Sequence, residues 1–163
     1  MRNKLLFLSI IIITFTLQLK AQNPIEIGTL NSANEELLLS GKNKSALRIA
    51  YIRTFNDGRK LDSVWVENVG GRKFLLMAGT RMNVKSLTAV SISIINNKVY
   101  VENTTEVKTC ANGSCTACSF FVEHNKVVAC KCESTGTVSN HCTFKVNDAV
   151  VFYTVLSKLN TGQ

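Results

Sequence analysis

Residues 110–142 read CANGSCTACSFFVEHNKVVACKCESTGTVSNHC and hold all six cysteines of the 163-residue chain. An even number of cysteines in one short segment predicts a disulfide framework, which would pin a region too polar to bury much surface of its own. The spacing does not choose among the possible pairings. We therefore expect up to three disulfides of unassigned connectivity among Cys110, Cys115, Cys118, Cys130, Cys132 and Cys142.

Two of these cysteines limit the pairing. Residues 126–133 are predicted to form a strand, on which side chains two residues apart point to the same face. Cys130 and Cys132 therefore cannot easily bond each other. Each is expected to bond a cysteine elsewhere, either in the segment 110–118 or at Cys142.

Residues 1–21 are predicted to be a cleavable secretory signal peptide. Residues 5–17, LLFLSIIIITFTL, are uncharged and mostly aliphatic, and Ala21 supplies a small residue at the cleavage point. A membrane-spanning helix needs about 20 apolar residues, whereas a signal peptide needs roughly 7 to 15. An uncleaved N-terminal anchor is the alternative. Residues 22–163 are then expected to form one exported globular domain without a membrane span, which is secreted, periplasmic or at the cell surface.

The start of the cysteine segment also suggests a different chemistry. The residues Cys110-Ala-Asn-Gly-Ser-Cys115-Thr-Ala-Cys118 resemble the cluster-binding loop of plant-type 2Fe–2S ferredoxins, which carry C-x4-C-x2-C and a distant fourth cysteine. The resemblance covers this loop alone, and it implies an iron–sulfur cluster held by these three cysteines. The later cysteines lie closer than the fourth ligand of that family.

A zinc or copper site is a related alternative, because thiolate and imidazole groups bind both metals. Its ligands would come from Cys130, Cys132, His141 and Cys142. Export brings thiols into contact with oxidants, so disulfides without a cofactor or metal are the preferred prediction.

Before the cysteine segment, the pattern predicts a short helix followed by strands. Ser32 and Glu35 fit a capping box and Gly41 fits a C-terminal stop, so a helix of about two turns is expected over residues 32–41. Alternating side chains over residues 45–52 predict the first strand. Further strands are expected at 63–67, 73–78, 88–95 and 98–102, with turns at 56–58, 70–71 and 96–97.

The remaining signals complete the predicted fold. Gly79 is assigned to a turn. Residues 148–159 fit either a helix that begins at Asp148 or a strand rich in β-branched residues, and the helix is preferred. The predicted class is α+β: an antiparallel β meander with a short N-terminal helix and a disulfide-pinned, cysteine-rich C-terminal subregion.

Basic residues crowd the middle of the chain, which has a net charge of +8. Residues 42–98 hold eleven Lys and Arg residues, against the acids Asp57, Asp62 and Glu67. A dispersed basic region can make weak contact with a polyanion or an anionic surface, and solvated strand faces are the alternative. Because exported proteins rarely meet nucleic acid, a protein or glycan partner is expected instead.

The sequence contains no recognisable catalytic constellation. The mature chain has only His124 and His141 as histidines, and it lacks the G-x-S-x-G and H-E-x-x-H patterns. Cysteines in disulfides are not nucleophiles. We therefore expect a non-catalytic binding or interaction protein of unknown ligand, and the alternative is a metal-binding or redox protein with free thiols.

Overall fold

The fold is β-rich, with two helices among the residues that the structure describes. In the computed structural model these are residues 23–31, 33, 35–103, 106–115, 117–124, 126–133, 138 and 141–161. The predicted signal peptide, residues 1–21, and the predicted helix cap Ser32 lie outside them. In chain order the elements are β1 (Ile25–Asn31), β2 (Glu36–Leu38), α2 (Gly41–Phe55), β3 (Lys60–Val69), β4 (Arg72–Arg81), β5 (Val84–Ile95), β6 (Lys98–Val101), β7 (Glu106–Asn112), β8 (Cys118–Glu123), β9 (Lys126–Cys132), β10 (Cys142–Asp148) and α3 (Val150–Thr161).

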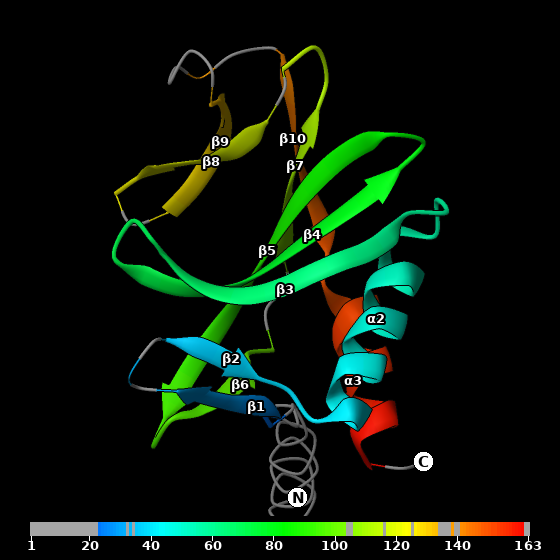
Figure 1. Ribbon diagram of the computed structural model, residues 1–163, viewed down its shortest axis with the longest axis vertical. Helices are drawn as coiled ribbons and strands as arrows, with labels where there is room; N and C mark the ends of the chain where they lie inside the picture. The colour runs from blue at the N-terminus through cyan, green and yellow to red at the C-terminus, as the bar shows by residue number, and fades with distance from the viewer. Residues whose placement is uncertain are drawn as a thin grey trace, which may run out of the picture.

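The long strand β5 organises the main sheet (Figure 1). Its residues 84–91 pair antiparallel with β4, and residues 86–89 also pair with β7 on the opposite edge. Its last residues, 92–95, pair with β6. The strand order is β10-β7-β5-β6-β1-β2, with β4 and then β3 beyond the other edge of β5, and β8 and β9 form a separate two-stranded sheet. The predicted antiparallel meander is thus confirmed for β3 to β6.

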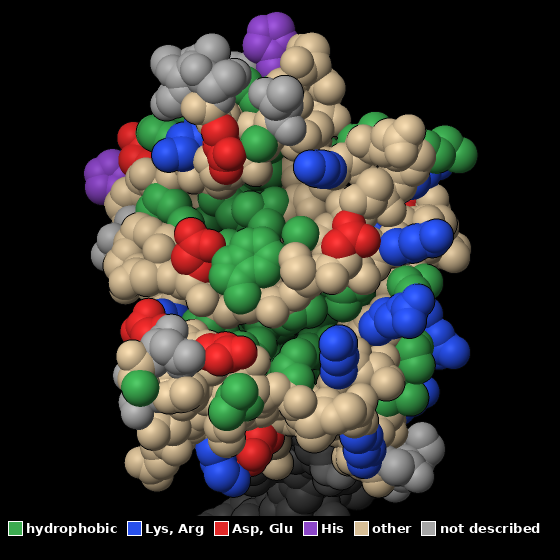
Figure 2. All heavy atoms as spheres, viewed as in Figure 1, with side chains coloured by type: hydrophobic (Ala, Val, Ile, Leu, Met, Phe, Trp, Pro, Cys, Tyr) green, Lys and Arg blue, Asp and Glu red, His purple; other side chains and the backbone are tan. Residues whose placement is uncertain are grey.

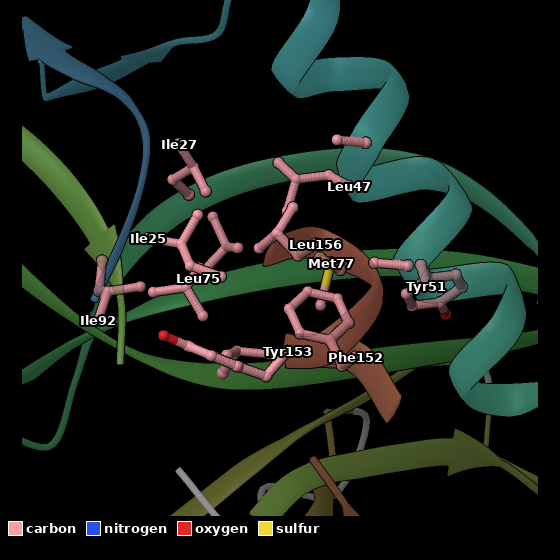
Figure 3. Packing of buried hydrophobic residues seen from close by; sticks show 14 of the residues in the cluster. Ile25, Ile27, Leu47, Tyr51, Leu75, Met77, Ile92, Phe152, Tyr153 and Leu156 are labelled. Carbon is pink, nitrogen blue, oxygen red and sulfur yellow. The ribbon is translucent and has the colours of Figure 1, made fainter. Parts of the chain in front are cut away.

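Strand β4 shows that both faces of the sheet are covered. Its side chains alternate between the faces, yet four consecutive residues are buried. Leu75 and Met77 pack with α2 and α3, and in Figure 3 the ring of Phe152 lies beside Met77. Phe74 and Leu76 pack instead with the β8–β9 hairpin. A continuous apolar run is the pattern expected of a strand that is buried on both faces.

Helix α2 lies where a strand was predicted, so the strand over residues 45–52 is wrong. The Ser40 hydroxyl caps the helix by accepting a hydrogen bond from the Asn43 amide at 3.1 Å. Ile49, which shares the two-residue alternation, is 37% exposed. The buried residues recur instead at helical spacing and are Ala46, Leu47, Ala50 and Tyr51.

The helix predicted over residues 32–41 is also wrong. Glu36–Leu38 form β2, which pairs antiparallel with β1. Glu35 has a φ of 55°, which a right-handed helix does not allow. Leu37 and Leu39 both pack against the helix-side core. Side chains two residues apart share a face on a strand but not on a helix, so the extended chain is the form that buries both.

Other predictions are confirmed. The turns at 70–71 and 96–97 carry positive φ angles at all four residues. The preferred helix over 148–159 is α3, whose first turn is fixed by a hydrogen bond of 2.7 Å from the Val150 amide to Asp148 Oδ1. The cap and the packing of α3 on the sheet decide against the β-branched preference of this segment.

Residues 56–58 carry positive φ angles at Asn56 and Gly58 but do not form the expected hairpin turn, and the turn predicted at Gly79 is wrong. Asn56 ends α2 with a φ of 43°, and the chain then enters β3, so residues 56–58 join a helix to a strand rather than two strands. Gly79 lies inside β4. A Cβ atom at Gly79 would overlap the hydroxyl of the buried Tyr51 and would lie 2.6 Å from the Lys60 carbonyl oxygen. The absence of a side chain at Gly79 therefore allows Tyr51, and with it α2, to pack closely against the sheet.

Replacing Gly79 by alanine is expected to destabilise the protein by about 2–4 kcal/mol, because a buried aromatic ring and a backbone carbonyl must both move. The midpoint of urea unfolding measures this effect. The matched control is Gly41→Ala, since a Cβ at Gly41 meets no atom within 4 Å. Equal stabilities for the two variants would contradict the close approach of Tyr51.

Candidate binding groove and disulfide cluster

The structure joins all six cysteines in three disulfides. Cys110 of β7 bonds Cys130 of β9, and Cys118 of β8 bonds Cys142 of β10. The third disulfide joins Cys115, in the loop before β8, to Cys132 of β9. The prediction that Cys130 and Cys132 bond cysteines elsewhere is therefore confirmed.

Two of these disulfides, Cys110–Cys130 and Cys118–Cys142, fasten the β8–β9 hairpin to β7 and β10 of the main sheet, and the third joins β9 to the loop before β8. Phe120 and Val127 of the hairpin pack with Phe74, Leu76 and Ala89 of the sheet, and the cystine sulfurs fill the space between them. A two-stranded hairpin is at best marginally stable alone in water. The hairpin layer thus depends on its cross-links as well as on this small core.

The predicted metal ligands come close together only in part. The Sγ atoms of Cys115, Cys118 and Cys142 lie within 4.8 Å of one another, but they belong to two different disulfides. Metals bind thiolates, so a metal or iron–sulfur site here requires the reduced chain. His141 is exposed, and its Nδ1 is hydrogen-bonded to the hydroxyl of Ser114.

Reduction of the disulfides is expected to release the β8–β9 hairpin before the helix-side core opens, because each cross-link contributes about 2–4 kcal/mol and none reaches α2 or α3. Hydrogen exchange, followed by mass spectrometry with and without a phosphine reductant, measures this difference. Peptides from residues 118–132 should lose protection first. Simultaneous loss of protection in α2, α3 and the hairpin would contradict this order.

A groove lies on the helix side of the sheet, beyond the C-terminal end of α2. It encloses about 580 Å³, within the roughly 300–1,000 Å³ range of small-molecule sites. Its walls are the end of α2, the loop before β3 and the β4–β5 turn. Its floor is formed by alternate residues of β5, β7 and β10, which are mostly polar, namely Ser86, Thr109, Ala111, Thr143, Lys145 and Asn147.

Three cations and one anion line this groove. Arg59 forms an ion pair of 2.9 Å with Asp57, and Arg81 lies 3.7 Å from the same carboxylate. Lys145 has no ion pair with any residue that the structure describes. Because Asp57 balances only one of the three positive charges, the groove has a surplus of positive charge. Figure 2 shows that Lys and Arg side chains also gather over α2 and the loop after it, on the right of that view.

Arg59 is held in place on several sides. Its guanidinium group stacks on the Phe55 ring at 4.1 Å and donates a hydrogen bond of 3.3 Å to Ser86 Oγ. Ser86 is buried, donates to the Gly79 carbonyl and lies 3.4 Å from the Tyr51 hydroxyl. The side chain of Arg59 is only 14% exposed. It is therefore a fixed part of the groove wall.

Asp57 is the counter-ion that keeps these arginines in position. Partial burial raises the pKa of Asp57, but hydrogen bonds from Arg59 and the charges of Arg59 and Arg81 outweigh that effect. Its pKa therefore lies below the ordinary value of 3.8. Folding therefore stabilises the charged carboxylate of Asp57 relative to its protonated form.

The sequence predicts only some of the residues that line this groove. The predicted basic region, residues 42–98, includes Arg59 and Arg81. Lys145 lies outside that range. Ser86 and Thr88 alternate with Leu87, which indicates a strand with one polar face. Only the pairing of β5 with β7, and of β7 with β10, shows that this face continues through Thr109 and Thr143.

Comparisons with protein-family models, with curated proteins and with solved structures find no match to this chain. Within the described part of the chain, neither helix has the length and apolar character that crossing a membrane requires.

The variant Asp57→Asn is expected to lose about 1 kcal/mol of stability at pH 7, because charge-assisted hydrogen bonds are replaced by neutral ones. Since the folded-state pKa of Asp57 is depressed, its contribution is fully present above the unfolded-state pKa and is lost as the pH falls through the folded-state pKa. The difference in melting temperature between variant and parent should therefore shrink below about pH 4. Glu123→Gln, at the exposed end of β8, is the control for removing a carboxylate. A pH-independent difference would contradict the role of Asp57.

Proposed function

We propose that this chain is an exported, non-catalytic binding protein that acts outside the cytoplasm, in the periplasm, at the cell surface or in the medium. The observation that carries the proposal is the polar, positively charged groove beside α2. Ligand sites in proteins are concave and contain a few convergent polar groups, and this groove combines both properties.

The compartment is inferred from the cysteines and from the N-terminal segment. Disulfides form and persist in oxidising compartments, and three of them clamp the hairpin layer. Residues 1–21 independently resemble an export signal. The two observations lie far apart in the chain and favour the same compartment.

A non-catalytic role is inferred from the groove's side chains. Nucleophilic catalysis needs a nucleophile within hydrogen-bond reach of a base. The groove lining contains neither cysteine nor histidine, and its one carboxylate, Asp57, is engaged by two arginines. Ser86 faces Arg59, which cannot accept its proton.

The rival proposal is a metal-binding or redox protein that keeps its thiols free. The proximity of the Sγ atoms of Cys115, Cys118 and Cys142 is the observation that favours it. Zinc, copper or an iron–sulfur cluster would then bind the reduced cysteine segment. The two proposals predict different oxidation states for the same six residues.

Expression of the full chain in a secretion-competent host separates them. The exported protein should begin near Gln22 and should have a mass lower than its reduced form by two hydrogens for each of the three disulfides. N-terminal sequencing and intact mass spectrometry measure both. A chain that starts at Gln22 without residues 1–21 is the control and should stay inside the cell. Alkylatable thiols or stoichiometric metal in the exported protein would support the rival instead.

A further inference from the structure

We propose that the groove beside α2 binds an acidic sugar, with the acid group held by Arg81 and Lys145 and the sugar hydroxyls lying over the polar strand residues of the floor. This inference rests on the proposed binding function, because it assigns a ligand class to the same groove. It differs from a general polyanion contact, since it requires one enclosed site of defined residues.

The charges of the groove select an anion. Arg59 is committed to Asp57 and Ser86, so it shapes the wall rather than offering a free charge. Arg81 is 48% exposed and lies 3.7 Å from Asp57, which leaves donors on its guanidinium group for a second anion. Lys145, on the floor, has no ion pair among the described residues. Together they present two cations to one cavity.

The floor of the groove suits a ligand rich in hydroxyl groups. In the antiparallel register Lys145 lies opposite Thr109, and Thr143 lies opposite Ala111. Thr109 is buried and accepts a hydrogen bond of 3.3 Å from the Asn147 side chain. Thr109 also lies 3.4 Å from the Thr88 hydroxyl, so it holds Asn147 in place and does not itself face a ligand. The exposed Thr143 hydroxyl and the side-chain carbonyl oxygen of Asn147 are then the groups beside Lys145 that can donate to and accept from the hydroxyls of a sugar.

The rim adds apolar contact of the kind that a sugar ring needs. Met82 is 85% exposed and Val84 is 45% exposed, and both line the groove. Met82 also has a φ of 46°, at a turn position where asparagine and glycine are preferred. Left-handed backbone is costly for such a residue, and strain of this kind is concentrated at binding sites. A sugar's C–H face can pack against these side chains.

A nucleic acid fits these features less well than an acidic sugar does. Proteins bind nucleic-acid backbones through extended grooves of positive charge, often with aromatic platforms for the bases. Here the two available cations share one cavity, and Phe55, the aromatic residue of the lining, is covered by Arg59. The compact arrangement matches a single acid group on a small, hydroxylated ligand.

The test uses the oxidised, exported protein, whose three disulfides are verified by mass in the same sample. The probes for titration calorimetry and amide NMR are digalacturonate, its dimethyl ester, a sulfated lactose and sodium sulfate. Digalacturonate or sulfated lactose should bind and should shift the amides of Thr109, Thr143 and Lys145. The neutral ester should bind at least about tenfold more weakly, because the charge-assisted hydrogen bonds are lost. The tighter of the two acidic sugars identifies the acid group as carboxylate or sulfate.

Two variants and a control locate the site. Arg81→Ala and Lys145→Ala should each weaken binding of the acidic sugar by about tenfold. Lys126→Ala removes the same charge from the exposed first residue of β9 and should change the affinity by less than about twofold. Equal losses in all three variants would overturn the groove site in favour of non-specific charge.

The remaining outcomes are also decisive. Sodium sulfate that binds as tightly as either sugar would overturn the sugar assignment, and so would equal binding of the ester. Absence of binding by an oxidised, exported sample would overturn the ligand class but leave the proposed binding function standing. Free thiols in the exported sample would overturn the proposed function whatever the sugar titration shows.

Discussion

Burial of strand β4 on both faces is the constraint on which the rest of the structure depends. Residues 74–77 alternate between two cores, so the sheet is stable only when two separate layers cover it. The helices α2 and α3 provide the first layer through aliphatic and aromatic packing. The β8–β9 hairpin provides the second, and it is too small to hold that position by packing alone. The disulfides Cys110–Cys130 and Cys118–Cys142 join the hairpin to β7 and β10 and so help to hold this second layer on the sheet.

The helix layer stops before the end of the sheet, and this explains where the groove lies. Near the middle of the sheet its helix-side face is apolar, with Val90 and Val107 buried beneath the helices. Beyond the end of α2 the same face continues as Ser86, Thr109 and Thr143. Ser86 and Thr109 are buried there and are satisfied by hydrogen bonds within the protein, whereas Thr143 is exposed and borders the groove. The groove therefore lies where α2 ends and no longer covers the sheet.

The sequence predicts those strands and disulfides whose defining residues lie close together in the chain. The turn residues at 70–71 and 96–97 and the two-residue spacing of Cys130 and Cys132 act within a few residues, and these predictions are confirmed. Helix α2 was missed because Leu47, Ile49 and Tyr51 fit a two-residue period as well as a helical one. The segment is a helix because that conformation buries Leu47 and Tyr51 against the sheet, which the two-residue alternation in the sequence does not reveal. The basic residues Arg59 and Arg81 fall within the predicted basic region, but their meeting with Lys145 in one groove depends on the pairing of β5, β7 and β10, which has no local signal.

Gly79 connects the packing of the sheet to the groove, and this connection restricts which residues can replace it during evolution. The missing side chain at this position admits Tyr51, whose hydroxyl lies against Ser86, and Ser86 accepts a hydrogen bond from Arg59. A larger residue at position 79 would require a smaller one at position 51, and the support of the arginine would change with it. Descendants of this chain should therefore keep positions 51 and 79 as a co-varying pair, although 27 residues lie between them in the sequence.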